Sequence, residues 1–150
     1  MSHGGIVKRI ALVGVLVLLP GLANAQADNK AIARRYFEEI LNKGNTATID
    51  AVIAADVIFR NPPTVIKGIA EFRKLVATLR AAIPDLQFTL EDEFGEGNKV
   101  ATRWVMRGGQ GKLNVSGMDI FLIENGKVRE IWVNMDTLAQ AQQMGMVPAK

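Results

Sequence analysis

The stretch MDIFLIENGKVREIWVNMD, residues 118–136, decides the fold of this chain. Large apolar residues alternate with other residues on both sides of Asn125-Gly126, a dipeptide that favours a tight turn between antiparallel strands. The stretch therefore predicts a β-hairpin. Two carboxylates, Asp119 and Asp136, lie near its open end, and the hairpin register decides what surrounds the first of them.

Two turn types fit this hairpin. A two-residue turn places Asp119 opposite Trp132, whereas a three-residue loop with Gly126 as a bulge places Asp119 opposite Ile131 and Gly117 opposite Val133. A one-residue slip moves every side chain to the other face. In the second register one face carries Asp119, Phe121, Arg129, Ile131, Val133 and Met135, and the other carries Met118, Ile120, Leu122, Glu130 and Trp132.

Helical patterns come first in the chain and strand patterns follow, which predicts an α+β fold. Amphipathic spacing predicts helices over residues 28–43, 46–54 and 69–83, and the chain closes with a short helix over 137–144. Alternation predicts a strand over 57–61, ended by Pro62-Pro63, and antiparallel strands from residue 86 to residue 135.

The predicted sheet carries apolar residues on both faces. Because the helices can cover only one face, we expect the other to be buried against a second copy of the chain. Trp132 would then lie in the interface of a homodimer. The small-molecule pocket would lie on the opposite, helix-covered face.

The first 25 residues have the features of a signal peptide. Lys8 and Arg9 precede the apolar run Ile10–Leu19, and Ala23-Asn24-Ala25 is a small-x-small cleavage pattern. A transmembrane helix needs roughly 20 apolar residues, so we expect cleavage after Ala25 and no membrane contact afterwards. Residues 26–150 would form one exported domain, periplasmic or secreted.

Composition excludes several kinds of chemistry. Loss of Lys8 and Arg9 lowers the formal charge from +3 to +1, and the remaining charges alternate in sign, so nucleic acid is not an expected partner. The chain has no cysteine, and its one histidine, His3, leaves with the signal peptide. Neither a Ser-His-Asp mechanism nor an ordinary zinc site can be built.

Four segments carry a resemblance to a known family: RNPP (60–63), NGKVREIW (125–132), Asp136 and QQMGMVP (142–148). The chain resembles the SnoaL-like polyketide (ester) cyclases, in the nuclear transport factor 2-like superfamily. The resemblance implies a cone-shaped fold with a deep pocket, and ring closure by intramolecular aldol chemistry without metal or cofactor. Enzymes and non-enzymes share this fold, so activity is left open.

The resemblance also implies site residues. Asn61 matches an asparagine before a proline, whereas the family's acid/base aspartate falls at Val133, its neighbouring histidine at Asp119 and a pocket glutamine at Gly117. Valine cannot transfer a proton, so Asp119 is the candidate replacement. The resemblance favours the register in which both strands share the pocket.

Each candidate has a structural alternative. Asp119 and Asn61 are the predicted catalytic residues, but Asp119 could pair with Arg129 or Arg103, and Asn61 could bond its own turn. Asp136 is expected to cap the last helix. The expected ligand contacts are Tyr36, with its hydroxyl at the pocket rim, one of Arg103 and Trp104, and Phe121, Ile131, Val133 and Met135.

Two other clusters are discounted as binding sites. The acidic residues Glu91–Glu93 and Glu96 are interpreted as a solvated turn, and the glycine-rich segment 108–111 precedes a strand and not a helix. The sequence thus predicts a pocket for a small apolar carbonyl or polyketide-like compound, with possible acid/base chemistry. The alternative is a non-catalytic exported binding or dimerisation module.

Overall fold

The computed structural model describes the backbone of residues 20–148 and the side chains of residues 28–148. Residues 1–19, with the apolar run of the expected signal peptide, lie outside the described residues. The expected cleavage site falls in the helix that begins at Pro20, in a part whose side chains are not described. Within the described chain, no helix combines the length and the apolar character that crossing a membrane requires.

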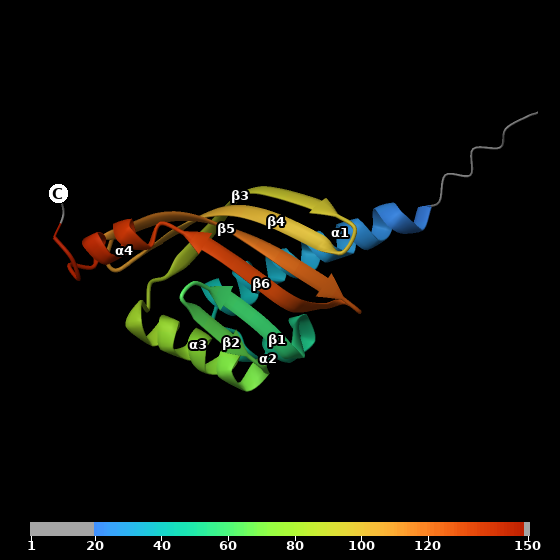
Figure 1. The fold of residues 1–150 in the computed structure, drawn as a ribbon, viewed down its shortest axis with the longest axis horizontal. Coiled ribbons are helices and arrows are strands. Elements are labelled where there is room, and N and C mark those ends of the chain that lie inside the picture. Colours follow the sequence, from blue (N-terminus) through green and yellow to red (C-terminus); the bar gives the residue numbers. More distant parts are fainter. Residues whose placement is uncertain (1–19, 149–150) are drawn as a thin grey trace, which may run out of the picture.

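One curved six-stranded sheet forms the frame of the molecule (Figure 1). Its spatial order is β2-β1-β6-β5-β4-β3, and all neighbours are antiparallel except β1 and β6, which run parallel. The strands are β1 (Ile53–Asn61), β2 (Thr64–Lys67), β3 (Gln87–Glu96), β4 (Lys99–Gly108), β5 (Leu113–Glu124) and β6 (Lys127–Met135). The sheet is therefore mixed, within the predicted α+β class.

The helices gather on one face of this sheet, and α4 lies at its end (Figure 1). They are α1 (Pro20–Arg35), α2 (Thr46–Val52), α3 (Ile69–Ala82) and α4 (Thr137–Gln143). The helix predicted to end at residue 43 is continuous, but its last part is the π-helix η1 (Tyr36–Asn42). The helix predicted over 46–54 ends at Val52, because the backbone is already extended at Ile53, where β1 begins.

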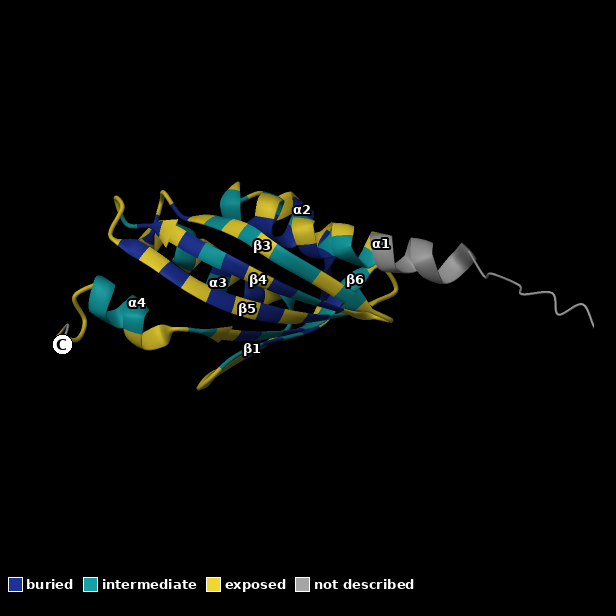
Figure 2. Ribbon diagram, turned by 90° about the horizontal axis from the view of Figure 1, so that it is seen from above, coloured by how far each residue is buried: buried dark blue, intermediate teal, exposed yellow. Residues whose placement is uncertain are grey.

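Burial alternates strictly along β5, as the pattern of the sequence predicts (Figure 2). The inner side chains pack on the helices and form the core, while Met118 and Ile120 on the outer face stay 52% and 42% exposed. The Asn42 side chain ties η1 to β3: its amide donates to the Phe88 carbonyl (2.9 Å) and accepts from the Phe88 amide (2.7 Å). This pair fixes Phe88 beside the inner cavity.

The hairpin has the two-residue turn of the first alternative, but beyond the turn its register differs from both predictions. Glu124 pairs with Lys127, so Asn125 and Gly126 form a two-residue turn with φ of 52° and 74°. The register then shifts, because Arg129 is an extra residue in β6. Both expected pairings were wrong as a result.

Beyond the bulge, Asp119 pairs with Val133 and Gly117 pairs with Met135. Since an even number of positions separates this register from the bulged one, Asp119 still shares a face with the inward side chains of β6. The expected common face is confirmed for Asp119, Phe121, Ile131, Val133 and Met135, but not for Arg129, which is the extra residue of the bulge and pairs with Asp56.

Candidate functional site

A cavity of about 140 Å³ lies between the helices and the inner face of the sheet. Tyr36, Leu41, Phe72, Leu75, Val76, Leu79 and Gln140 line it from the helices. Phe59, Asn61, Phe88, Trp104, Met106, Asp119, Val133 and Met135 line it from the strands. The walls are thus mostly aromatic and aliphatic, with a few polar groups, as is common in small-molecule sites.

Of the described residues in this lining, Asp119 is the one carboxylate. It lies in the middle of β5, only 2% exposed, and its Oδ1 accepts a hydrogen bond of 3.0 Å from the indole nitrogen of Trp104. Burial among apolar side chains disfavours the charged form and raises the pKa of Asp119 to about 7, against a smaller lowering by the Trp104 bond. The carboxyl can therefore give or take a proton near neutral pH.

Trp104 reaches Asp119 because Gly117 leaves room for the indole. Gly117 pairs with Trp104 across β4 and β5, and a Cβ at Gly117 would overlap Cζ2 and Cη2 of the Trp104 ring. Phe88 packs edge-on against the other part of the indole, with 5.0 Å between ring centroids. A glycine below the ring and a phenylalanine beside it thus hold the donor on Asp119.

Tyr36 comes from the first turn of η1 and is 3% exposed. Burial raises the pKa of its phenol well above the ordinary 10, and repulsion from the Asp119 charge raises this pKa further. The phenol is therefore neutral at physiological pH and retains its O–H donor. Leu41, five positions on, lines the same cavity, which the wide π-helical turn makes possible.

Three further predicted residues line the cavity. Asn61 ends β1 and is half-buried, with its amide nitrogen 4.0 Å from the Met135 sulfur, and Val133 and Met135 line the cavity from β6. Asn61 precedes Pro62, as in the resemblance, and it lies at the cavity and not only in a turn.

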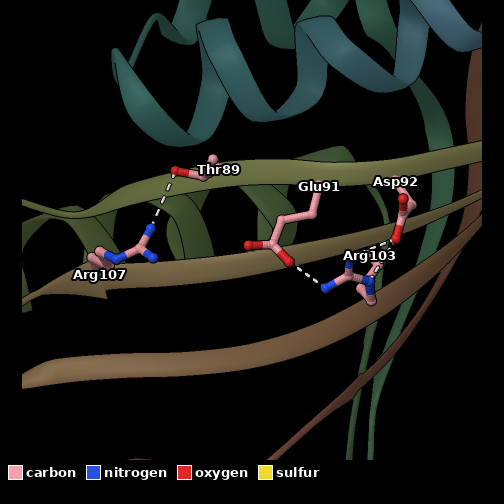
Figure 3. A network of polar contacts seen from close by, with 5 residues as sticks. All are labelled: Thr89, Glu91, Asp92, Arg103 and Arg107. Carbon is pink, nitrogen blue, oxygen red and sulfur yellow. Dashed lines mark hydrogen bonds and ion pairs between the residues drawn. The ribbon is translucent and has the colours of Figure 1, made fainter.

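Two predicted contacts, Phe121 and Ile131, are wrong, and of the alternatives Arg103 and Trp104 it is Trp104 that lines the cavity. Phe121 and Ile131 are fully buried beneath the cavity wall, where Phe121 packs on Tyr36 and Phe37, so they belong to the core. Arg103 points to the opposite face and pairs with Glu91 and Asp92 (Figure 3). Alternation along β4 turns Trp104 inward and Arg103 outward.

The ion pair considered for Asp119 is also wrong. Arg129 lies at the bulge and pairs with Asp56 at 2.8 Å, while Arg103 is engaged with Glu91 and Asp92. No cation among the described side chains pairs with Asp119, whose recorded partner is Trp104. The Asp119 carboxyl is thus bonded to a neutral donor and not to a cation that would keep it ionised.

The second carboxylate of the opening stretch, Asp136, is structural as predicted. Its Oδ1 accepts a 2.8 Å bond from the Ala139 amide and caps α4. The discounted glycine-rich loop has an internal partner as well, because the Asp85 carboxylate accepts from the Gly109 and Gln110 amides. In the described part of the chain, no cluster of acidic residues is arranged to hold a metal ion.

A family model of the SnoaL-like polyketide cyclases matches residues 31–144, which include every lining residue of the cavity. The chain belongs to this family. No curated protein sequence gives a match.

Solved structures support the same fold. TsrD from Streptomyces laurentii is 26% identical, with a TM-score of 0.72 over 81% of this chain and 98% of that one. A candidate polyketide cyclase from Bacillus cereus ATCC 10987 is 22% identical, with a TM-score of 0.75 over 86% and 89%. A candidate SnoaL-like polyketide cyclase from Jannaschia sp. CCS1 is 20% identical, with 0.73 over 82% and 95%. The expected cone-shaped α+β fold is thereby confirmed.

Several lining residues of this SnoaL-like protein escaped the sequence analysis. Phe72 and Leu79 belong to the amphipathic helix predicted over 69–83, but an apolar position on such a helix does not distinguish packed core from cavity wall. Phe88 and Met106 likewise belong to recognised alternating strands. No sequence pattern pointed to Gln140, because it reaches the cavity only through the position of α4 in the fold.

Proposed function

We propose that this SnoaL-like protein binds a small apolar carbonyl compound in the cavity and exchanges a proton with it through Asp119. The observation that carries the proposal is the pairing of Asp119 with Val133. The resemblance places the family's acid/base aspartate at Val133, and cross-strand partners have Cβ atoms only about 5 Å apart. Compared with the family's aspartate, the carboxyl of this chain would therefore lie on the neighbouring strand, at the same level of the sheet.

The surroundings of Asp119 suit a reversible proton transfer. Its raised pKa, about 7, matches the pH at which a general base is partly ionised and its conjugate acid is partly formed. The ionised carboxylate would take a proton from the carbon next to the ligand carbonyl, and the C–H electrons would move into an enolate. The protonated carboxyl would then return the proton to that carbon. Alternatively, the enolate carbon would attack a second carbonyl carbon of the same ligand, the π electrons of that C=O bond would move to its oxygen, and this oxygen would take the proton from the Asp119 carboxyl.

Two neutral groups would assist the ligand carbonyl. The Tyr36 phenol keeps its proton and can donate to an oxygen that gains charge in the enolate. The Asn61 amide is half-buried in the cavity wall and can donate to the same oxygen or to a second polar group. These groups orient the ligand, whereas Asp119 moves the proton.

Deuterium exchange tests this function directly. Cyclohexanone in D₂O would exchange its α-protons faster with the protein than without it, as followed by proton NMR. Asp119→Asn keeps the size and the acceptor for Trp104 but loses the acid/base group, so we expect the catalysed rate to fall by about 100-fold or more. Glu124→Gln, an exposed carboxylate at the end of the same strand, is the matched control and should exchange as the wild type does.

The outcomes separate catalysis from binding. Equal exchange rates for the wild type and Asp119→Asn would exclude Asp119 as the base. Binding without any catalysed exchange would instead favour a protein that only carries or sequesters the ligand.

We also propose that two copies of the chain associate through the outer face of the sheet. Met118 and Ile120 are exposed there, and Trp132 beside Ile120 is half-buried on a face that none of the described helices covers. Paired charges border this strip, with Arg103 on one side and Arg60 on the other. An apolar centre with a polar rim is the usual anatomy of a protein interface.

A further inference from the structure

We propose that the ligand is neutral and about as large as one six-membered ring, and that Trp104 sets this size limit. The inference rests on the proposed function, because it specifies the ligand of the same cavity. Three features of the cavity support this inference: its volume, the charges of its lining residues and the contacts that hold the Trp104 ring.

The volume limits the buried part of the ligand. The cavity measures about 140 Å³, and an engineered apolar cavity of about 150 Å³ in another protein binds benzene. Sites for drug-sized ligands span about 300–1,000 Å³. Two or three fused rings therefore exceed this cavity unless its wall moves.

The charges of the lining exclude anionic ligands. Among the side chains that the structure describes, no lysine or arginine lines the cavity, and the lining acid that ionises near neutral pH is Asp119. A carboxylate or phosphate would lose its hydration without a counter-ion and would meet the Asp119 charge. A neutral ketone instead meets hydrogen-bond donors: the phenol of Tyr36 and the amide of Asn61.

The Trp104 side chain is the part of the cavity wall that its contacts hold most firmly in place. Its ring lies against the Gly117 backbone on one side and touches Phe88 edge-on, and its indole nitrogen is bonded to Asp119. Displacing it for a larger ligand would break that bond and leave a buried N–H without a partner. A smaller residue at this position would enlarge the cavity next to the carboxyl.

Calorimetric titration of the protein with three probes tests the inference. Acetophenone carries one ring and a neutral carbonyl, 2-acetylnaphthalene adds a second fused ring, and benzoate keeps one ring but is anionic. We expect acetophenone to bind, 2-acetylnaphthalene to bind about tenfold more weakly or not at all, and benzoate not to bind. Trp104→Leu should remove or reverse the preference for the smaller ketone.

Trp132→Leu is the matched control, because Trp132 lies on the outer face of the sheet and should leave the preference unchanged. Circular dichroism would check that both variants fold, and the wild-type comparison stands without them. Equal or tighter binding of 2-acetylnaphthalene, or binding of benzoate, would overturn the size or charge limit and leave the proposed function intact. Failure of both ketones to bind would overturn the proposed function as well.

Discussion

Burial of the Asp119 carboxyl links the stability of the fold to pH. The pKa of this group is about 7 in the folded chain and 3.8 in its ordinary environment, so the folded state holds the proton more tightly. The contribution of Asp119 to the free energy of unfolding is therefore largest below its ordinary pKa of 3.8, and it is lost as the pH rises through about 7. A site that can ionise at neutral pH thus lowers the stability of the protein that carries it.

Asp119→Asn should remove this dependence. Between about pH 4 and about pH 8, the free energy of unfolding of the wild type should fall relative to that of the variant, by on the order of 4 kcal/mol. Urea unfolding at a series of pH values would measure both curves, and the difference between the proteins isolates Asp119 from the other carboxylates. Parallel curves would mean that the carboxyl ionises in the folded state as it does in water.

The short helix α4 depends on its N-terminal cap. None of its residues is buried, and it is held by Asp136 at its start and by Gln143, whose side chain bonds the Asn114 backbone at 2.8 and 3.2 Å. Such a helix opens locally at little cost. Because Gln140 of α4 lines the cavity, opening of α4 would also change the cavity wall.

Asp136→Ala should therefore loosen α4 without unfolding the domain. Loss of an N-cap costs about 1 kcal/mol, so amide hydrogen exchange over residues 137–143 should speed up by about fivefold, with an unchanged melting temperature. Asp136→Asn keeps an acceptor oxygen and serves as the control, with exchange close to that of the wild type. A variant that melts at a clearly lower temperature would show that α4 is part of the cooperative core.

The hairpin shows how far the sequence predicts this fold. Alternation around Asn125-Gly126 predicts both strands but leaves two registers open, and it is the resemblance to the SnoaL-like family that favours a shared face for Asp119 and Val133. The bulge at Arg129 could not be read, since any one residue of β6 could be the extra one. The contact between Trp104 and Asp119 depends on the pairing of a different strand, β4, and on the clearance at Gly117.

At the scale of the whole molecule, the sheet separates two surfaces of different use. Its inner face holds the cavity, while its outer face leaves Met118 and Ile120 exposed. The charges around this outer face are largely paired within the chain, as Arg103 with Glu91 and Asp92 shows (Figure 3). A second copy could therefore cover the apolar strip without burying unpaired charges.

The dimer is tested by charging that strip. In Met118→Lys/Ile120→Lys, like charges would face each other across the interface, so we expect the dissociation constant to rise by about 100-fold or more. Sedimentation over a range of concentrations would detect dimer in the wild type and monomer in the variant. Leu138→Lys is the matched control: this side chain is 61% exposed on α4, which lies at the end of the sheet (Figure 1), so the dimer should persist. A wild type that sediments as a monomer, or a dimer that persists with both lysines, would mean that this face is not the interface. Ligand binding should be unchanged in the double variant, because both substituted side chains point away from the cavity.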